Sequence, residues 1–330
     1  MLDWLIIGGG IHGVHAAHVL VDGQGWPRDR VRLLDPHPEL LANWTRLTGN
    51  VGMAFMRSPG VHHLGLEARD LTKYARRQTA VSHRLFAEPY QRPAYALFQA
   101  HNQHLIHTYR LDELHIQGAA QGLARQRDGW RVETEQGVLA AKRVLLAIGR
   151  SRPHWPEWAV VGRALGPPIQ HIFASDYTPP HSAIPNPHSA ILVIGGGITA
   201  AQAALRLAEQ QPGAVTLLMR QPIREHQFDS DPGWLGPKYQ DRLHKTADYA
   251  QRRQMIQAAR HRGSMPREVV RQVRRAQKAG ELCVQEGEIT AVVPMLKNGR
   301  IELVCRDGQH IWAEQVVLAT GFNPARPGEA

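Results

Sequence analysis

The sequence has little cysteine: only Cys283 and Cys305 occur in 330 residues, and no Cys-x-x-Cys pair is present. This excludes a disulfide framework and a dithiol redox centre of the thioredoxin-reductase kind. Both thiols lie in apolar, strand-like segments, so we expect them to be core residues. No apolar run approaches the ~20 residues of a membrane span, and no basic leader precedes the first apolar strand. The expected location is the cytoplasm, with no membrane partner.

Acidic residues are also scarce: 29 Asp and Glu face 39 Lys and Arg, which gives a formal charge of +10. Nucleic acid, acidic lipid, or anionic cofactors and substrates can each account for such an excess. The basic residues concentrate in 252–278, where no nucleic-acid-binding motif accompanies them. We therefore interpret this stretch as a solvated helical face, and we expect a small-molecule substrate rather than a nucleic acid as partner.

Glycine-rich turns are present twice. Residues 5–13 read LIIGGGIHG and residues 192–200 read LVIGGGITA. In the first copy, Gly8, Gly10 and Gly13 fit G-x-G-x-x-G between an apolar strand and a small-residue helix. The first glycine permits a tight turn, the second lets backbone approach a pyrophosphate, and the third lets helix pack on strand. The next strand ends at Asp35, whose carboxylate can accept a hydrogen bond from a ribose hydroxyl.

The second copy differs at its acceptor position. Gly195, Gly197 and Ala200 fit the related G-x-G-x-x-A form, but the following strand, VTLLMR, ends at Arg220, with Arg224 close by. An acid at this position favours an unphosphorylated ribose, whereas a cation suits a 2′-phosphate. The residues therefore predict NADP(H) rather than NAD(H) on the second copy.

The repeat extends beyond the turns, because each copy continues into a strand meander that closes on Ala-x-Gly. This layout predicts an α/β fold with two Rossmann-like dinucleotide-binding domains. We expect the first domain at 1–155, a linker at 156–188, and the second domain at 189–312 with a basic helical excursion at 221–280. Residues 313–330 are expected to return a strand to the first domain, which makes that domain discontinuous and the second one inserted.

Four further segments resemble those of the flavin-containing monooxygenases and the microbial N-hydroxylating monooxygenases of ornithine and lysine. Trp44 resembles the Trp that follows the second strand of the FAD domain. The other segments are Met56-Arg57-Ser58-Pro59 followed by His62-His63-Leu64, the linker-like Gly149…Pro153-x-Trp155-Pro156, and Ala319-Thr320-Gly321-Phe322.

The resemblance implies FAD on the first domain and NADPH on the second, with NADPH reducing the flavin and oxygen then oxygenating a small nucleophilic substrate. His62 and His63 follow the segment that resembles a flavin-contacting one, so they are the candidate groups near the reactive ring. The candidate cofactor-binding residues are Gly8, Gly9, Gly10, His12, Gly13, Asp35, Trp44, Arg57, Gly149, Gly195, Gly197, Ile198, Thr199, Arg220, Arg224, Thr320 and Gly321.

Two histidine runs have the spacing His-x-x-His-x-x-His, at 12–18 and 101–107. Such spacing can place two imidazoles on one helical face, as a metal site requires. No acidic or cysteine ligand stands near in sequence, so we expect structural or surface histidines and no metal.

The chain departs from the resembling families in three places, which keeps other functions open. Residues 229–239, DSDPGWLGPKY, resemble the Asp-Ser-Pro-Phe segment of the hydroxylases only loosely, which leaves their amino-acid substrates open for this chain. Gly166 and His171 are one residue too far apart for the monooxygenase fingerprint, and Tyr177 lies too far on. This favours an alternative, an NADPH-dependent flavin reductase or dehydrogenase with an acceptor other than oxygen. The chain also ends nine residues after Gly321, where related flavoproteins continue, so a C-terminal FAD segment is expected to be missing. A non-catalytic nucleotide-binding regulator is the third possibility.

Overall fold

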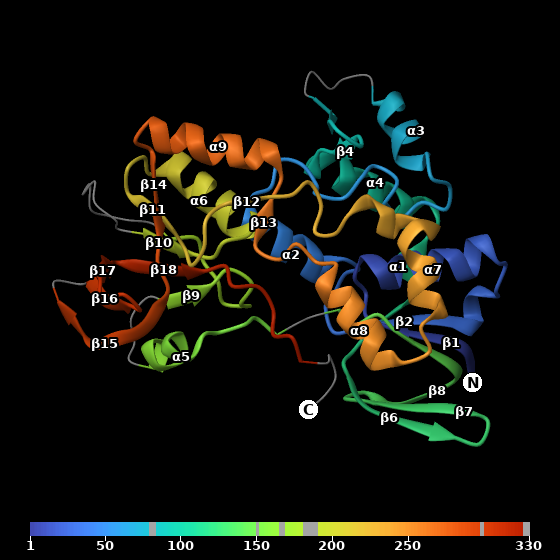
Figure 1. Cartoon of the computed structure of the whole chain (residues 1–330). Coiled ribbons are helices and arrows are strands. Elements are labelled where there is room, and N and C mark those ends of the chain that lie inside the picture. The colour runs from blue at the N-terminus through green and yellow to red at the C-terminus, as the bar shows by residue number, and fades with distance from the viewer. Residues whose placement is uncertain (79–83, 150–151, 165–168, 181–190, 298–299, 326–330) are drawn as a thin grey trace. The chain divides into compact units, whose positions relative to one another are not determined.

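A computed structural model describes residues 1–78, 84–149, 152–164, 169–180, 191–297 and 300–325 (Figure 1). The chain divides into two units. The first holds Met1–Gly49 and Met53–Arg152, together with Pro324 and Ala325 from the end of the chain, and the second holds Asn50–Gly52 and Pro153–Asn323. Each unit is an α/β layer structure built on a largely parallel sheet, so the predicted α/β fold class with two Rossmann-like domains is confirmed.

The first unit is organised by a six-stranded sheet of order β5-β2-β1-β8-β7-β6. The first four strands of this order run parallel, and β8, β7 and β6 form the antiparallel meander predicted from the sequence. The strands are β1 (Leu2–Ile7), β2 (Val31–Asp35), β5 (His115–Gln117), β6 (Ala120–Gln126), β7 (Gly129–Thr134) and β8 (Gly137–Leu146). A short pair, β3 (Phe86–Ala87) and β4 (Arg92–Pro93), stands apart.

Side chains of β1 are buried on both faces of this sheet, as a parallel strand covered on two sides requires. Ile6 packs with Val14 of the first helix in one core cluster, while Leu5 and Ile7 pack with Val132 of the meander in another. The helices of the unit are α1 (Ile11–His18), α2 (Ala42–Val51), α3 (Asp70–Arg77) and α4 (Tyr95–Thr108). This packing holds the turn between β1 and α1 at the carboxyl edge of the sheet.

The second unit repeats the arrangement with a five-stranded, wholly parallel sheet of order β14-β11-β10-β18-β9. Its own meander, β15-β16-β17, forms a separate three-stranded sheet. The strands are β9 (Ile169–His171), β10 (Ile191–Ile194), β11 (Val215–Met219), β14 (Leu282–Glu286), β15 (Ile289–Lys297), β16 (Arg300–Cys305), β17 (His310–Ala313) and β18 (Gln315–Leu318).

Helices of the second unit lie on its sheet and in the segment 221–280. In Figure 1, α9 lies beside α6, and its buried face carries Val269, Val270 and Val273. The helices are α5 (Glu157–Ala164), α6 (Ile198–Gln210), α7 (Pro237–Lys245), α8 (Tyr249–Ala258) and α9 (Arg267–Lys278), and a short strand pair joins β12 (Arg224–Glu225) to β13 (Ser264–Met265). The predicted excursion is thus helical, but α9 is part of the packed domain and only its outer face is basic.

Two predicted boundaries are wrong. Residues 156–188 were expected to be a linker, yet α5 and β9 lie there, and Ile169 and Trp158 belong to the core of the second unit. Residues 165–168, which include Gly166, and residues 181–188 of that segment lie outside the described residues. The sequence predicts a linker here because β9 is only three residues long, and because its Pro- and Ser-rich flanks have the composition of a loop.

The strand expected to return to the first domain also goes elsewhere. Val316 and Val317 of β18 pair in parallel with β10 and β9, which makes β18 the counterpart of β8 rather than an extra strand of the first sheet. Both sequence copies therefore close on their own sheet. The last five residues, 326–330, lie outside the description.

The cysteine prediction holds for one thiol only. Cys305 is buried, whereas Cys283 of β14 is exposed. No helix among the described residues is long and apolar enough to cross a bilayer.

Candidate functional site

The first glycine turn has one open side. A Cβ added at Gly8, whose φ is +114°, would lie 2.4 Å from the Ala147 carbonyl oxygen, and one added at Gly13 would lie 1.8 Å from the Gly8 oxygen. A Cβ at Gly10, by contrast, would meet nothing within 4 Å. Gly10 also precedes α1, and no side chain caps the first N–H groups of this helix.

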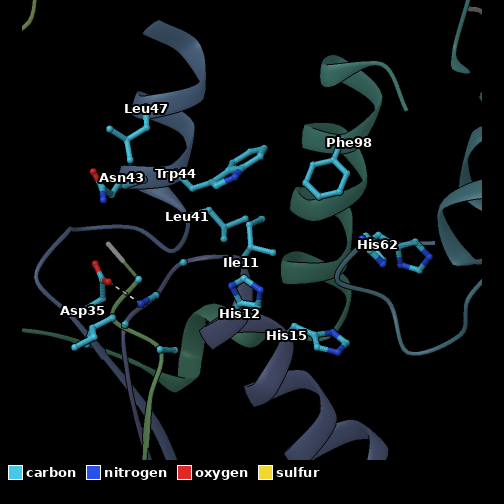
Figure 2. Close-up of a pocket in the computed structure, with 18 of the residues that line it drawn as sticks. Ile11, His12, His15, Asp35, Leu41, Asn43, Trp44, Leu47, His62 and Phe98 are labelled. Atoms are coloured by element: carbon cyan, nitrogen blue, oxygen red, sulfur yellow. Dashed lines mark hydrogen bonds between the residues drawn. The ribbon is translucent and has the colours of Figure 1, made fainter. Parts of the chain in front are cut away.

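A cavity of about 610 Å³ adjoins the open side of the turn, and all its lining residues belong to the first unit (Figure 2). Nine predicted site residues line it: Gly8, Gly9, Gly10, His12, Asp35, Trp44, His62, His63 and Gly149. Gly13 lies beneath the turn, and Arg57 lies between two lining residues, Met56 and Ser58, without lining the cavity itself. The structure therefore brings most of the first predicted set together.

The predicted ribose acceptor, Asp35, lies beside the turn at the end of β2. Its Oδ2 accepts a hydrogen bond from the Gly9 N–H at 2.6 Å, drawn as the dashed line in Figure 2. Its Oδ1 accepts from the His37 backbone N–H at 3.0 Å and lies 2.8 Å from His37 Nδ1. The carboxylate is thus fixed in orientation at the rim of the cavity.

Aromatic side chains form one wall of the cavity. Trp44 of α2 and Phe98 of α4 face one another in Figure 2, with ring centroids 5.5 Å apart. Tyr95 lies 5.8 Å from the Trp44 ring, and its hydroxyl is 2.8 Å from the Thr48 Oγ1. Phe98 is not predictable from the sequence, because it lies 54 positions after Trp44 and no local motif marks it.

The two candidate histidines have different surroundings. Both ring nitrogens of His63 are engaged by the loop that follows it: Nδ1 accepts from the Gly65 N–H at 3.1 Å, so Nε2 carries the proton and donates to the Ala68 carbonyl at 3.2 Å. His62 lies on the rim of the cavity, and partial burial lowers the pKa of its imidazole. Of the pair, His63 is therefore held by its own loop, and His62 stays the candidate for proton exchange.

The second turn repeats the geometry of the first. A Cβ at Gly195 would lie 2.6 Å from the Ala319 carbonyl oxygen, as one at Gly8 would approach Ala147. At Gly197 a Cβ would meet only the Gly263 Cα, at 3.7 Å. Ile198 begins α6 there, and no side chain caps the first N–H groups of this helix.

Cationic side chains stand at the end of the next strand in this unit. Arg220 directly follows β11 and is exposed, while Arg224 of β12 donates from Nη1 to the Arg262 carbonyl at 3.3 Å. Arg262 precedes Gly263, which adjoins the turn. This connection is not predictable from the sequence, because β12 and β13 pair across 38 intervening residues.

A hydrogen-bonded chain holds Thr320 and Gly321 after β18. The buried His171 accepts from the Phe173 N–H at Nδ1, so its Nε2 carries the proton and points to the Thr320 Oγ1 at 3.2 Å. The Thr320 hydroxyl donates to the His154 carbonyl, and the His154 N–H donates to Gly321 at 2.9 Å. Burial lowers the pKa of His171 to about 4, so this chain rests on a neutral imidazole.

The residues at the two turns fit dinucleotides. Each turn leaves open the position where backbone meets a pyrophosphate, each opens an uncapped helix, and one is followed by an acid and the other by an exposed cation. Within the described part of the chain, no group of three His, Cys, Asp or Glu side chains is placed to hold a metal ion.

Comparison with known proteins agrees with this geometry. Residues 5–151 match the family model described as FAD-NAD(P)-binding, and residues 102–265 match the one described as pyridine nucleotide-disulphide oxidoreductase. No curated protein matches the chain by sequence.

Solved structures match over almost the whole chain at low identity. The ornithine hydroxylase PvdA from Pseudomonas aeruginosa has a TM-score of 0.72 at 14% identity, covering 99% of this chain and 84% of its own. The cadaverine monooxygenase DfoA from Erwinia amylovora, solved bound to FAD, has 0.71 at 14%, covering 99% and 80%. The bacillithiol disulfide reductase Bdr from Staphylococcus aureus has 0.56 at 14%, covering 98% and 77%.

Fold, turns and family models define the class: the chain is an FAD- and NAD(P)-binding oxidoreductase with two Rossmann-type domains. Within that class its fold is that of the flavin monooxygenases and the ornithine and lysine N-hydroxylases.

Proposed function

We propose that the chain is an NADPH-dependent flavin monooxygenase that oxygenates a small nucleophilic substrate. The observation that carries the proposal is the pair of open glycine turns, followed by Asp35 in one unit and by the exposed Arg220 in the other. The first pattern suits the ribose of FAD, and the second suits the 2′-phosphate of NADPH.

On the first unit, the N–H groups at the start of α1 would hold the FAD pyrophosphate across the open face of Gly10. Asp35 would accept a hydrogen bond from the adenosine ribose. Trp44 and Phe98 would exclude water from one wall of the cavity. Bound FAD would supply the two-electron chemistry, and the protein orients and shields it.

On the second unit, the N–H groups of Ile198 and Thr199 would hold the NADPH pyrophosphate beside Gly197. Arg220 would pair with the 2′-phosphate, and Arg224 would support it from β12. The hydrogen bond between His171 and Thr320 holds the segment Ala319-Thr320-Gly321 against this glycine turn.

His62 is the residue we propose to handle protons at the cavity. Partial burial lowers the pKa of its imidazole and so favours the neutral ring, which accepts a proton at one nitrogen and donates one from the other. A nucleophilic substrate must be deprotonated to react, so a neutral rim histidine suits that task. Amines are the substrates in the names of the lysine and ornithine enzymes with this fold.

The test is anaerobic reduction of the FAD-loaded protein by NADPH, followed by admission of oxygen. We expect NADPH to bleach the flavin spectrum, and oxygen with a nucleophilic substrate to give an oxygenated product. Bound FAD that NADPH fails to reduce would overturn the proposal.

A second candidate is an NADPH-dependent flavin reductase whose acceptor is not oxygen. Its supporting observation is His171, the histidine of the irregularly spaced fingerprint, which is fully buried and hydrogen-bonded to Thr320 rather than facing a cavity. The disulfide reductase fold match is compatible with it. Hydrogen peroxide or a reduced acceptor, in place of oxygenated product, would favour this candidate.

A further inference from the structure

The Asp35 carboxylate has three hydrogen-bonding contacts to neighbouring residues among those that the structure describes. It takes one hydrogen bond from Gly9 at Oδ2 and two contacts from His37 at Oδ1. Its side chain is only 13% exposed, whereas that of His37 is 38% exposed. A carboxylate offers about four acceptor positions. Three are filled within the protein, so one is left for a ligand hydroxyl.

The His37 imidazole is oriented by the same contact. An ionised carboxylate only accepts hydrogen bonds, so Nδ1 carries the proton and donates to Asp35 across 2.8 Å. The backbone N–H of His37 bonds the same oxygen at 3.0 Å and keeps the residue in place. On the other side, the Cβ and Cγ of Asp35 lie against Gly9, at 2.9 and 3.0 Å from an ideal Cβ there. The carboxylate is therefore clamped between the turn and one histidine.

We propose that His37 is a positioning residue for dinucleotide binding, which sets the Asp35 carboxylate so that its one remaining acceptor position meets the adenosine ribose. Without the imidazole, Oδ1 keeps only the backbone N–H and gains access to water. The carboxylate then turns more freely about its side-chain torsions and loses the orientation that binding uses. The inference rests on the proposed FAD site of the first unit and adds a residue that no glycine-turn pattern marks.

The test measures FAD affinity by flavin fluorescence on apo protein, which needs no turnover. We expect His37→Ala to weaken binding roughly ten-fold, as befits one charge-assisted hydrogen bond. His37→Asn, whose side-chain amide can donate near the position of Nδ1, should recover most of the affinity. Comparing the two variants separates the loss of FAD affinity caused by removing the hydrogen-bond donor from the loss caused by any substitution of His37.

A double-mutant cycle with Asp35→Asn shows whether His37 acts through the carboxylate. If it does, His37→Ala has little further effect in the Asp35→Asn background. Equal losses in both backgrounds, or wild-type affinity in His37→Ala, would overturn the inference while leaving the FAD site intact. Wild-type protein that binds no FAD would overturn both the inference and the proposed function.

Discussion

His62 and His63 adjoin in sequence, but the geometry separates their roles. His63 closes its own loop through both ring nitrogens, and His62 stands on the cavity rim. His63→Ala leaves the Gly65 N–H and the Ala68 carbonyl without a buried partner, so it should lower the free energy of unfolding by about 1–3 kcal/mol.

His62→Ala should leave the unfolding free energy within about 0.5 kcal/mol of wild type and lower kcat by about 100-fold, the low end of general acid–base effects. Denaturant titration and steady-state turnover measure the two quantities. The opposite pattern, with His63→Ala stable but inactive, would contradict these assignments.

Arg220 is the residue that we propose to select NADPH over NADH. Arg220→Ala should raise the KM for NADPH by about ten-fold or more and leave that for NADH nearly unchanged, because only NADPH carries the 2′-phosphate. Arg271→Ala, an exposed residue of α9, removes the same charge from the same unit and is the matched control. Equal losses for both nucleotides in Arg220→Ala would show that the guanidinium does not read the 2′-phosphate.

At the scale of the element, each strand–turn–helix unit contains glycines where a side chain would clash with the backbone and glycines where a side chain would have room. Gly13→Ala forces a Cβ against the Gly8 carbonyl, so it should destabilise the fold, whereas the open Gly10 has an extended φ of −76° that alanine adopts freely. Gly10→Ala should fold like wild type and bind FAD at least ten-fold more weakly, because its methyl occupies the place of the pyrophosphate.

Gly197→Ala is the matched variant on the second unit. Its φ is −102° and its Cβ meets only the Gly263 Cα, so folding and FAD affinity should be unchanged while the KM for NADPH rises. Fluorescence titration of FAD and steady-state kinetics measure these effects. Loss of FAD binding in Gly197→Ala would reverse our assignment of cofactors to the units.

The elements that the sequence predicted well are those specified by local patterns. Gly8 and Gly10 predicted a turn after the first strand, and Asp35 predicted the end of the second strand. The structure has both strands, β1 and β2, and the turn at these positions. Pairing partners are not local. Nothing near β18 indicates that it joins β10 and β9, and the three-residue β9 carries too short a pattern to distinguish it from a linker.

At the scale of the whole molecule, buried neutral histidines predict acid sensitivity. Burial lowers the pKa of His101 and of His171 from 6.5 to about 4. Below pH 6.5 the unfolded chain binds protons that the folded protein does not, so stability falls as the pH drops from about 6.5 to 4.

The loss is at most about 3.5 kcal/mol per histidine, from about 1.4 kcal/mol per pKa unit. Denaturant unfolding at several pH values measures it. The double variant His101→Asn/His171→Asn should lose stability less steeply over this range. An unchanged slope would contradict the pKa assignments.

The duplicated layout shows what the sequence can and cannot specify at this scale. Two copies of the same turn and meander were enough to predict two Rossmann-like units, whereas the order of the strands in each sheet is known only from the structure. The cavity of the first unit was predictable in its glycines and Asp35, but Phe98 and Leu47 reach it only through tertiary packing. The His37 contact follows from side-chain geometry two residues beyond the acid, which no turn motif includes.

The most direct test of the account is an anaerobic titration of the FAD-loaded chain with NADPH, monitored by the visible flavin spectrum. We predict stoichiometric bleaching by NADPH and slower bleaching by NADH, with the preference for NADPH lost in Arg220→Ala. A chain that binds FAD but keeps an oxidised flavin spectrum in excess NADPH would contradict the claim that the two turns serve one electron-transfer reaction.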